Sequence, residues 1–210
     1  MAPRAALAQH EEAVAAELER YFARAYAPGP RAIAKRHRVE IGVGAGVVPT
    51  DAQRVYVPIS GRLAFHITEW LGVEASFSYS FASETEQGAE LARSGSSSVR
   101  EAQLWRLGAA LAWSPLDGKL RLGQLVAGFE PYLLGGFGVV SMDALAAIGV
   151  EAAIRPEWLV GAGLRVCFAR RWLVRLEYRQ HLHLRKSAPR GGGLGAAAEF
   201  ALGFGVLLGG

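Results

Sequence analysis

Residues 172–185 show the feature that most constrains this fold, a strict alternation of apolar and charged side chains. From Val174 onward, every second residue is apolar except Gln180, and the residues between them are arginine, glutamate or histidine: Val174, Leu176, Tyr178, Leu182 and Leu184 against Arg175, Glu177, Arg179, His181, His183 and Arg185. Successive side chains of a β-strand point to opposite faces, whereas a helix would scatter these charges around its surface. The stretch therefore predicts a strand with one apolar and one charged face.

The same period of two runs from residue 38 to the C-terminus. It predicts strands over residues 38–48, 55–67, 70–81, 99–113, 127–140, 154–168, 172–185 and 197–208. Longer loops are expected at 83–98, 141–151 and 186–195, with short turns between the other strands, and residues 119–126 could extend the strand that follows them. Eight strands of about 11–15 residues, joined alternately by turns and loops, indicate an antiparallel up-and-down barrel with strands long enough to cross a bilayer.

The side chains of the two faces decide which face is outside. The charged face is also rich in glycine, alanine and serine, which suits the narrow interior of an eight-stranded barrel. The apolar face carries large residues on every strand and would overfill that interior. The tryptophans lie towards strand ends or in the outer bands of the strands, as interfacial aromatic residues do: Trp70, Trp105, Trp113, Trp158 and Trp172. These features favour a transmembrane barrel with its apolar face outward over a soluble barrel with the faces reversed.

On this interpretation, charges of both signs lie inside the barrel. Buried charges are tolerated when they are paired, so we expect ion pairs that fill the lumen. The predicted lumen residues are Glu40, Arg62, Glu74, Arg106, Glu130, Arg165, Arg175, Glu177, Arg179 and Glu199. A lumen packed in this way argues against the transport of large solutes.

Composition narrows the remaining functional classes. Cys167 is the single cysteine, which excludes an intramolecular disulfide and gives no support to a zinc cluster. The net charge of +4 is modest, and the basic residues form no stripe with interleaved aromatics. We therefore expect no nucleic-acid partner, no metal and no cofactor.

The N-terminal region differs from the rest of the chain. Residues 1–8 read as a remnant of a signal peptide, because Ala6-Leu7-Ala8 has the form of a signal-peptidase site although the segment is short. Residues 9–36 are expected to form an amphipathic helix over 9–27 and a linker, and residues 37–210 the barrel. The helix could be a lid or docking arm, or a segment that binds a partner.

Several short segments resemble the small bacterial outer-membrane β-barrel domain proteins, a family with many myxobacterial members. They are Lys35-Arg36-His37-Arg38-Val39-Glu40, Phe65-His66-Ile67-Thr68-Glu69-Trp70 with Glu74, Trp113-Ser114-Pro115 with Gly118-Lys119, and Phe129-Glu130-Pro131-Tyr132 with Gly135-Gly136. The resemblance implies an eight-stranded barrel in the bacterial outer membrane, made with a signal peptide, and no particular activity. The chain ends in Leu207-Leu208-Gly209-Gly210 instead of the family's terminal aromatic residue, so an assembly signal would be internal, for example at Phe204.

Three histidines are the candidates for catalysis, because some barrels of this kind resemble lipid-modifying enzymes. His66, His181 and His183 could each act as a general base. The sequence places no serine or acid near His181 and His183, which favours polar residues at the rim of the barrel over a catalytic site. We therefore expect no enzyme.

Three functions remain open from the sequence. The first is a structural or envelope-interaction barrel that contacts outer-membrane lipids and binds a periplasmic or envelope protein through its loops and N-terminal helix. The second is a narrow channel or a barrel that binds a small ligand. The third, a membrane enzyme, has the least support.

Overall fold

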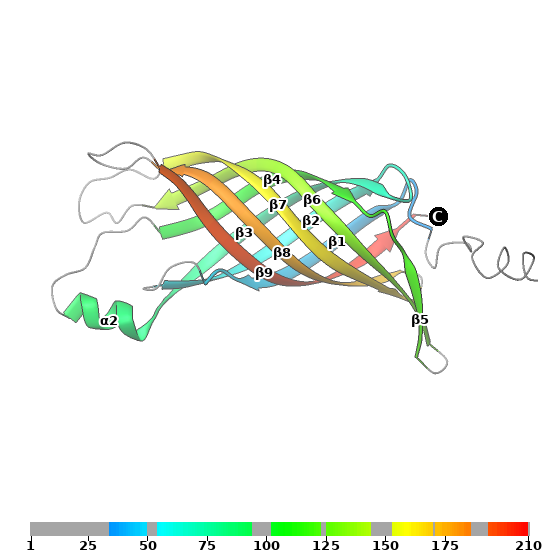
Figure 1. Cartoon of the computed structure of the whole chain (residues 1–210), viewed down its shortest axis with the longest axis horizontal. Coiled ribbons are helices and arrows are strands. Elements are labelled where there is room, and N and C mark those ends of the chain that lie inside the picture. Colours follow the sequence, from blue (N-terminus) through cyan, green and yellow to red (C-terminus); the bar gives the residue numbers. More distant parts are fainter. Residues whose placement is uncertain are drawn as a thin grey trace, which may run out of the picture. The chain divides into compact units, whose positions relative to one another are not determined.

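A closed antiparallel β-barrel makes up the part of the chain that the structure describes (Figure 1). The structure is a computed structural model, and it describes residues 34–49, 54–93, 102–122, 125–143, 153–169, 171–185 and 193–209. The segment predicted to be a signal remnant and the helix predicted over 9–27 lie outside these residues. Among the described residues, no helix is long and apolar enough to cross a membrane.

Nine strands and one helix are described. They are β1 (Val39–Val47), β2 (Arg54–His66), β3 (Leu71–Glu84), α2 (Glu86–Arg93), β4 (Ala102–Trp113), β5 (Gly118–Leu122), β6 (Leu125–Asp143), β7 (Ala153–Phe168), β8 (Trp172–Arg185) and β9 (Gly193–Leu208). The sheet runs in the order β4-β3-β2-β1-β9-β8-β7-β6-β5, and a further pairing between β4 and β6 closes it. Eight strands therefore form the wall, and β5 pairs with the first residues of β6.

The prediction of eight wall strands is confirmed, with boundaries that move by a few residues. Two local predictions were incomplete. Only the end of the segment 119–126 extends the following strand, because β5 ends at Leu122 and β6 begins at Leu125. The expected polar loop over 83–98 contains α2, whose first turn carries Glu86 and whose last turn carries Arg93, charges that suit the two ends of the helix dipole.

The two ends of the barrel differ in their connections. Short connections at 67–70, 114–117 and 169–171 share one end with the start of β1 and the finish of β9, and we call this the turn end. At the other end, which we call the loop end, α2 follows β3 (Figure 1), and longer stretches of sequence separate the strands β3 and β4, β6 and β7, and β8 and β9. In outer-membrane barrels the short turns face the periplasm and the long loops face outward.

Burial is inverted relative to a soluble protein. The side chains of β2 alternate between buried and exposed along most of the strand. Large apolar residues lie outside, with Phe137 71% exposed and Leu202 60% exposed. The largest fully buried side chains include Arg165, Arg175 and Glu40. A belt of apolar side chains around a charged interior is the arrangement of a barrel that spans a membrane.

Glycines on the inner face let β4 and β6 approach closely. Gly136 faces Ala110 in the ladder, and a Cβ atom added to Gly136 would overlap the Ala109 carbonyl oxygen and lie 2.6 Å from Ala110 Cα. Gly135, its neighbour on the outer face, has nothing within 4 Å of the same added atom. The small residue is therefore required on one face of this strand only.

We predict that Gly136→Val destabilises the barrel by about 1–3 kcal/mol, since an added side chain overpacks the β4–β6 contact. Gly135→Val is the matched control and should leave stability within about 0.5 kcal/mol. Urea unfolding of the refolded barrel, followed by heat-modifiable gel mobility, measures both variants. Equal stability of the two variants would show that the close approach is unimportant.

Candidate functional site

The lumen gathers all the charged residues that the sequence placed there. Each of the ten is buried, with exposed fractions between 0% and 6%: Glu40, Arg62, Glu74, Arg106, Glu130, Arg165, Arg175, Glu177, Arg179 and Glu199. They come from strands around the wall and not from one segment, because inward positions recur at every second residue of each strand. The structure joins them into two groups, one nearer the turn end and one nearer the loop end.

Arg175 is the centre of the group nearer the turn end. Its Nη1 lies 2.8 Å from Glu40 Oε1, and its Nη2 lies 2.8 Å from Glu74 Oε2 and 2.9 Å from Glu177 Oε1. Its Nε donates a hydrogen bond to the Tyr132 hydroxyl at 3.0 Å. One guanidinium thus connects β1, β3, β6 and β8 across the barrel.

Two more arginines share the same carboxylates. Arg62 Nη1 donates to Glu177 Oε1 at 2.6 Å. Arg179 donates to Glu177 Oε2 at 2.9 Å through Nε and to Glu74 Oε1 at 2.8 Å through Nη2. Each of these glutamates faces more than one guanidinium, as a carboxylate with two oxygens can. The contacts form a network in which removal of one partner affects several others.

The aromatic ring of Tyr132 fills the space between two cations. The guanidinium carbons of Arg165 and Arg175 lie 4.9 and 4.8 Å from the ring centroid, within the range of cation–π contacts. The Tyr132 hydroxyl also donates a short hydrogen bond to Glu177. The period of two places Tyr132 on the inner face with Glu130, although Tyr132 was not among the residues predicted to form ion pairs.

At the turn end, the network continues to a residue outside the strands. Arg165 lies 3.1 Å from Glu130 Oε2 and 3.5 Å from Glu40 Oε2. The other oxygen of Glu130 forms a close ion pair with Lys35, whose Nζ also donates to Ser114 Oγ at 3.3 Å. Lys35 is 3% exposed although it precedes β1. The sequence included Lys35 in a family motif but did not assign it to the lumen.

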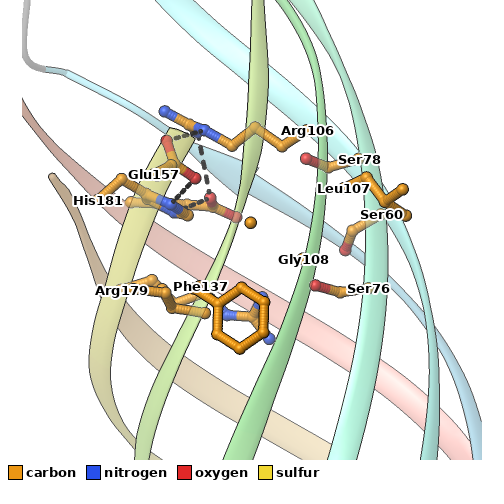
Figure 2. Close-up of a pocket in the computed structure, with 13 residues that line it drawn as sticks. Ser60, Ser76, Ser78, Arg106, Leu107, Gly108, Phe137, Glu157, Arg179 and His181 are labelled. Carbon is orange, nitrogen blue, oxygen red and sulfur yellow. Dashed lines mark hydrogen bonds and ion pairs between the residues drawn. The ribbon is translucent and has the colours of Figure 1, made fainter. Parts of the chain in front are cut away.

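The group nearer the loop end is built around a histidine. His181 Nδ1 lies 2.8 Å from Glu157 Oε1, and His181 Nε2 lies 3.0 Å from Glu199 Oε2. Arg106 faces the same two carboxylates, at 3.0 Å from Glu157 through Nε and 3.7 Å from Glu199 through Nη1 (Figure 2). The prediction of a rim position for His181, with no acid near it, is therefore wrong. The acids come from β7 and β9, the strands on either side of β8, and their register could not be inferred from one sequence.

The other two histidines are also buried. His66 Nε2 lies 3.1 Å from Glu40 Oε2 at the end of β2. His183 is 5% exposed, so it too is not a surface residue of the rim. The hydroxyl of Ser60, a serine of the inner face, donates to the Gly44 carbonyl oxygen at 3.4 Å. Among the described residues, no group of three histidine, cysteine, aspartate or glutamate side chains is arranged to hold a metal ion.

A small cavity lies inside the wall beside the loop-end group. Its volume is about 20 Å³, and its polar lining includes Ser60, Ser76, Ser78, Arg106 and Arg179 (Figure 2). A cavity of this size has room for roughly one water molecule. Figure 2 shows the three serines on one side and Arg179 and His181 on the other. The arrangement can hold solvent against the charged groups, but it is too small for an organic solute.

The outer surface carries aromatic residues near both ends of the barrel. Trp70, Trp113 and Trp172 lie near the turn end and are 48%, 44% and 43% exposed, and the ring of Trp172 stacks on Phe204 at 5.3 Å. Tyr79 and Phe81 lie towards the loop end of β3, with ring centroids 5.2 Å apart. Aromatic residues at two levels of the outer surface match the two interfaces of a bilayer.

An apolar outer belt, aromatic residues at two levels and a charged interior together define a transmembrane β-barrel. The model of the outer membrane protein beta-barrel domain family matches residues 23–206 of the chain. The chain belongs to this family, and it is an outer-membrane protein. No curated protein matches it significantly.

Solved structures resemble the chain at low sequence identity. The N-terminal β-barrel domain of OprF from Pseudomonas aeruginosa has 12% identity and a TM-score of 0.54, over 82% of this chain and 98% of that one. Ail of Yersinia pestis has 15% identity and a TM-score of 0.40, over 81% and 97% of the two chains. Neisserial surface protein A has 10% identity and a TM-score of 0.42, over 80% and 95%. The likeness to OprF shows a shared barrel fold.

We predict that Arg175→Met destabilises the barrel by about 3–5 kcal/mol, because it leaves several buried carboxylates short of a cation. Arg54→Met is the control, since Arg54 and Glu84 form a partly exposed ion pair at 4.0 Å whose loss should cost about 0–1 kcal/mol. Urea unfolding in lipid vesicles, monitored by tryptophan fluorescence, compares them. A similar midpoint for the two variants would contradict a stabilising role for the network.

The outer belt gives a second prediction. Leu202→Arg, near the middle of β9, should cost about 2–4 kcal/mol in a bilayer because it places a charge in the hydrocarbon layer. Leu116→Arg is the control, as Leu116 is 65% exposed in the connection 114–117 at the turn end. The yield of folded barrel on insertion into vesicles measures the difference. Equal insertion of Leu202→Arg and the control would contradict a lipid-facing position for Leu202.

Proposed function

We propose that this protein is a structural or envelope-interaction barrel whose lumen is closed by its ion pairs. It contacts outer-membrane lipids through the apolar belt. It binds a periplasmic or envelope protein through its loops and the helix predicted over 9–27. In this role the barrel wall is a rigid anchor, and the protein performs no catalysis.

The single observation that carries this proposal is the continuity of charged contacts through the lumen near the turn end. Lys35, Glu130, Arg165, Glu40 and Arg175 follow one another in contact, and each is at most 5% exposed. An ion that crossed this region would have to separate buried pairs, which is costly in a low-dielectric interior. The contacts therefore support a closed lumen.

A specific observation favours the second candidate, a narrow channel. The cavity beside Ser60, Ser76 and Ser78 is lined by hydroxyls, and Nη1 and Nη2 of Arg106 donate no hydrogen bond to the described part of the protein. A water at this position would give the loop-end half of the lumen some hydration. A channel would still need a path past Arg175 and its carboxylates.

Conductance in planar bilayers separates the two candidates. The native barrel should show no stable open level. Arg62→Ser combined with Glu177→Ser removes one cation and one anion that lie 2.6 Å apart, and should produce measurable open levels because both replacements are small. The same change at the exposed pair, Arg54→Ser with Glu84→Ser, is the control and should leave the native trace unchanged. A native barrel that conducts steadily would make the channel the better function.

The interaction role is tested separately by capture of envelope proteins with the full chain. We expect capture of a defined partner to be lost when residues 9–27 are deleted, while the barrel still shows heat-modifiable mobility. Capture that does not depend on this segment or on the loops would contradict the binding role.

A further inference from the structure

Residues 34–38, just before β1, make contacts that belong to the mouth of the barrel and not to its wall. The side chain of Lys35 reaches Glu130 on β6 and Ser114 in the connection after β4. The backbone N–H groups of Lys35 and Arg36 donate to the two carboxylate oxygens of Glu69, at 2.9 and 3.2 Å. A segment of five residues is thus attached to three separate parts of the turn end.

A sharp change of direction separates this segment from the strand. His37 has φ 59°, a left-handed conformation that is uncommon for residues other than glycine. Its N–H donates to the His66 carbonyl oxygen at 2.7 Å, and the Arg38 N–H donates to the Lys35 carbonyl oxygen at 2.9 Å. The chain turns at His37, so Lys35 lies over the mouth while Val39 begins the wall pairing with Phe65.

The charged side chains of the wall are paired with one another even without Lys35. Four arginines of the turn-end group face four glutamates before Lys35 is counted, namely Arg62, Arg165, Arg175 and Arg179 with Glu40, Glu74, Glu130 and Glu177. Glu130 also has Arg165 at 3.1 Å, so it would retain a cation after Lys35 left. Withdrawal of Lys35 therefore leaves no carboxylate of this group without a cation, which makes the segment separable from the wall.

We propose that residues 34–38 form a releasable latch that closes the turn-end mouth of the lumen. The latch is held by the Lys35–Glu130 ion pair and by the Glu69 carboxylate, and it turns about His37. Because the chain continues directly from Ala34 towards the N-terminus, a partner that holds the preceding segment acts on the latch without deforming the barrel. This inference rests on the proposed closure of the lumen and adds the device that controls it from one end.

The native cysteine provides a reporter for the latch. Cys167 is 4% exposed and packs with Leu173 and Leu207 on the inner face at the turn end. Leu207 pairs with Glu40, the second residue of β1, so this cluster lies beside the latch. Cys167 is the only cysteine in the chain, so the rate of its reaction with a small, charged, water-soluble thiol reagent reports access through this mouth.

The test uses the full chain refolded in vesicles. Glu69→Ala and Lys35→Met should each accelerate Cys167 labelling at least tenfold while the heat-modifiable mobility of the barrel stays native. His37→Pro should do the same, since proline cannot adopt a positive φ and has no N–H to donate. Arg36→Ala is the matched control, because the exposed Arg36 reaches Glu69 through its backbone alone, and it should label at the native rate.

Native labelling rates in folded Glu69→Ala and Lys35→Met would overturn the latch. Equal acceleration in Arg36→Ala would also overturn it, since the effect would then be general loosening of the segment. Failure of the latch is distinct from failure of the proposed function: a closed lumen with unchanged labelling removes the latch only, whereas steady conductance of the native barrel removes the closure itself.

Discussion

The structure depends on the pairing of charges in a place where water is scarce. Arg175 with Glu40, Glu74 and Glu177 lies in a lumen whose wall is surrounded by apolar side chains, so each charge requires a partner at contact distance. The partners come from strands on different sides of the barrel. The charges can therefore find their partners only when the barrel closes. A wall that failed to close would leave the same groups in the membrane without partners.

The small residues of the inner face follow from the same condition. Guanidinium groups from β2, β4, β7 and β8 and the ring of Tyr132 from β6 occupy the lumen, and glycine, alanine and serine on β3, β4 and β6 leave them room. Where β4 and β6 meet, Gly136 permits an approach that a Cβ atom would prevent. The outer face has only to be apolar, with aromatic residues near its ends. A larger side chain is therefore expected to be tolerated at Gly135 but not at its neighbour Gly136.

Alternation alone predicted the strands and the residues of each face, because a period of two is a local property. Alternation could not predict which side chains contact one another. Arg175 and its partner Glu40 are 135 residues apart in the sequence, and they meet only because the barrel closes. The acids around His181 lie on neighbouring strands whose register one sequence does not reveal. Lys35 was missed because it precedes the periodic region, and α2 because it is short and lies among polar residues.

The central claim is that the apolar face meets lipid and the charged face lies inside. Quenching of the native tryptophans tests it without any substitution, since Trp70, Trp113 and Trp172 all lie on the outer face near one end. In vesicles, the account predicts strong quenching by lipids brominated near the head group, weaker quenching by lipids brominated at the chain ends, and little quenching by aqueous iodide. Quenching by iodide with no effect of any brominated lipid would contradict it.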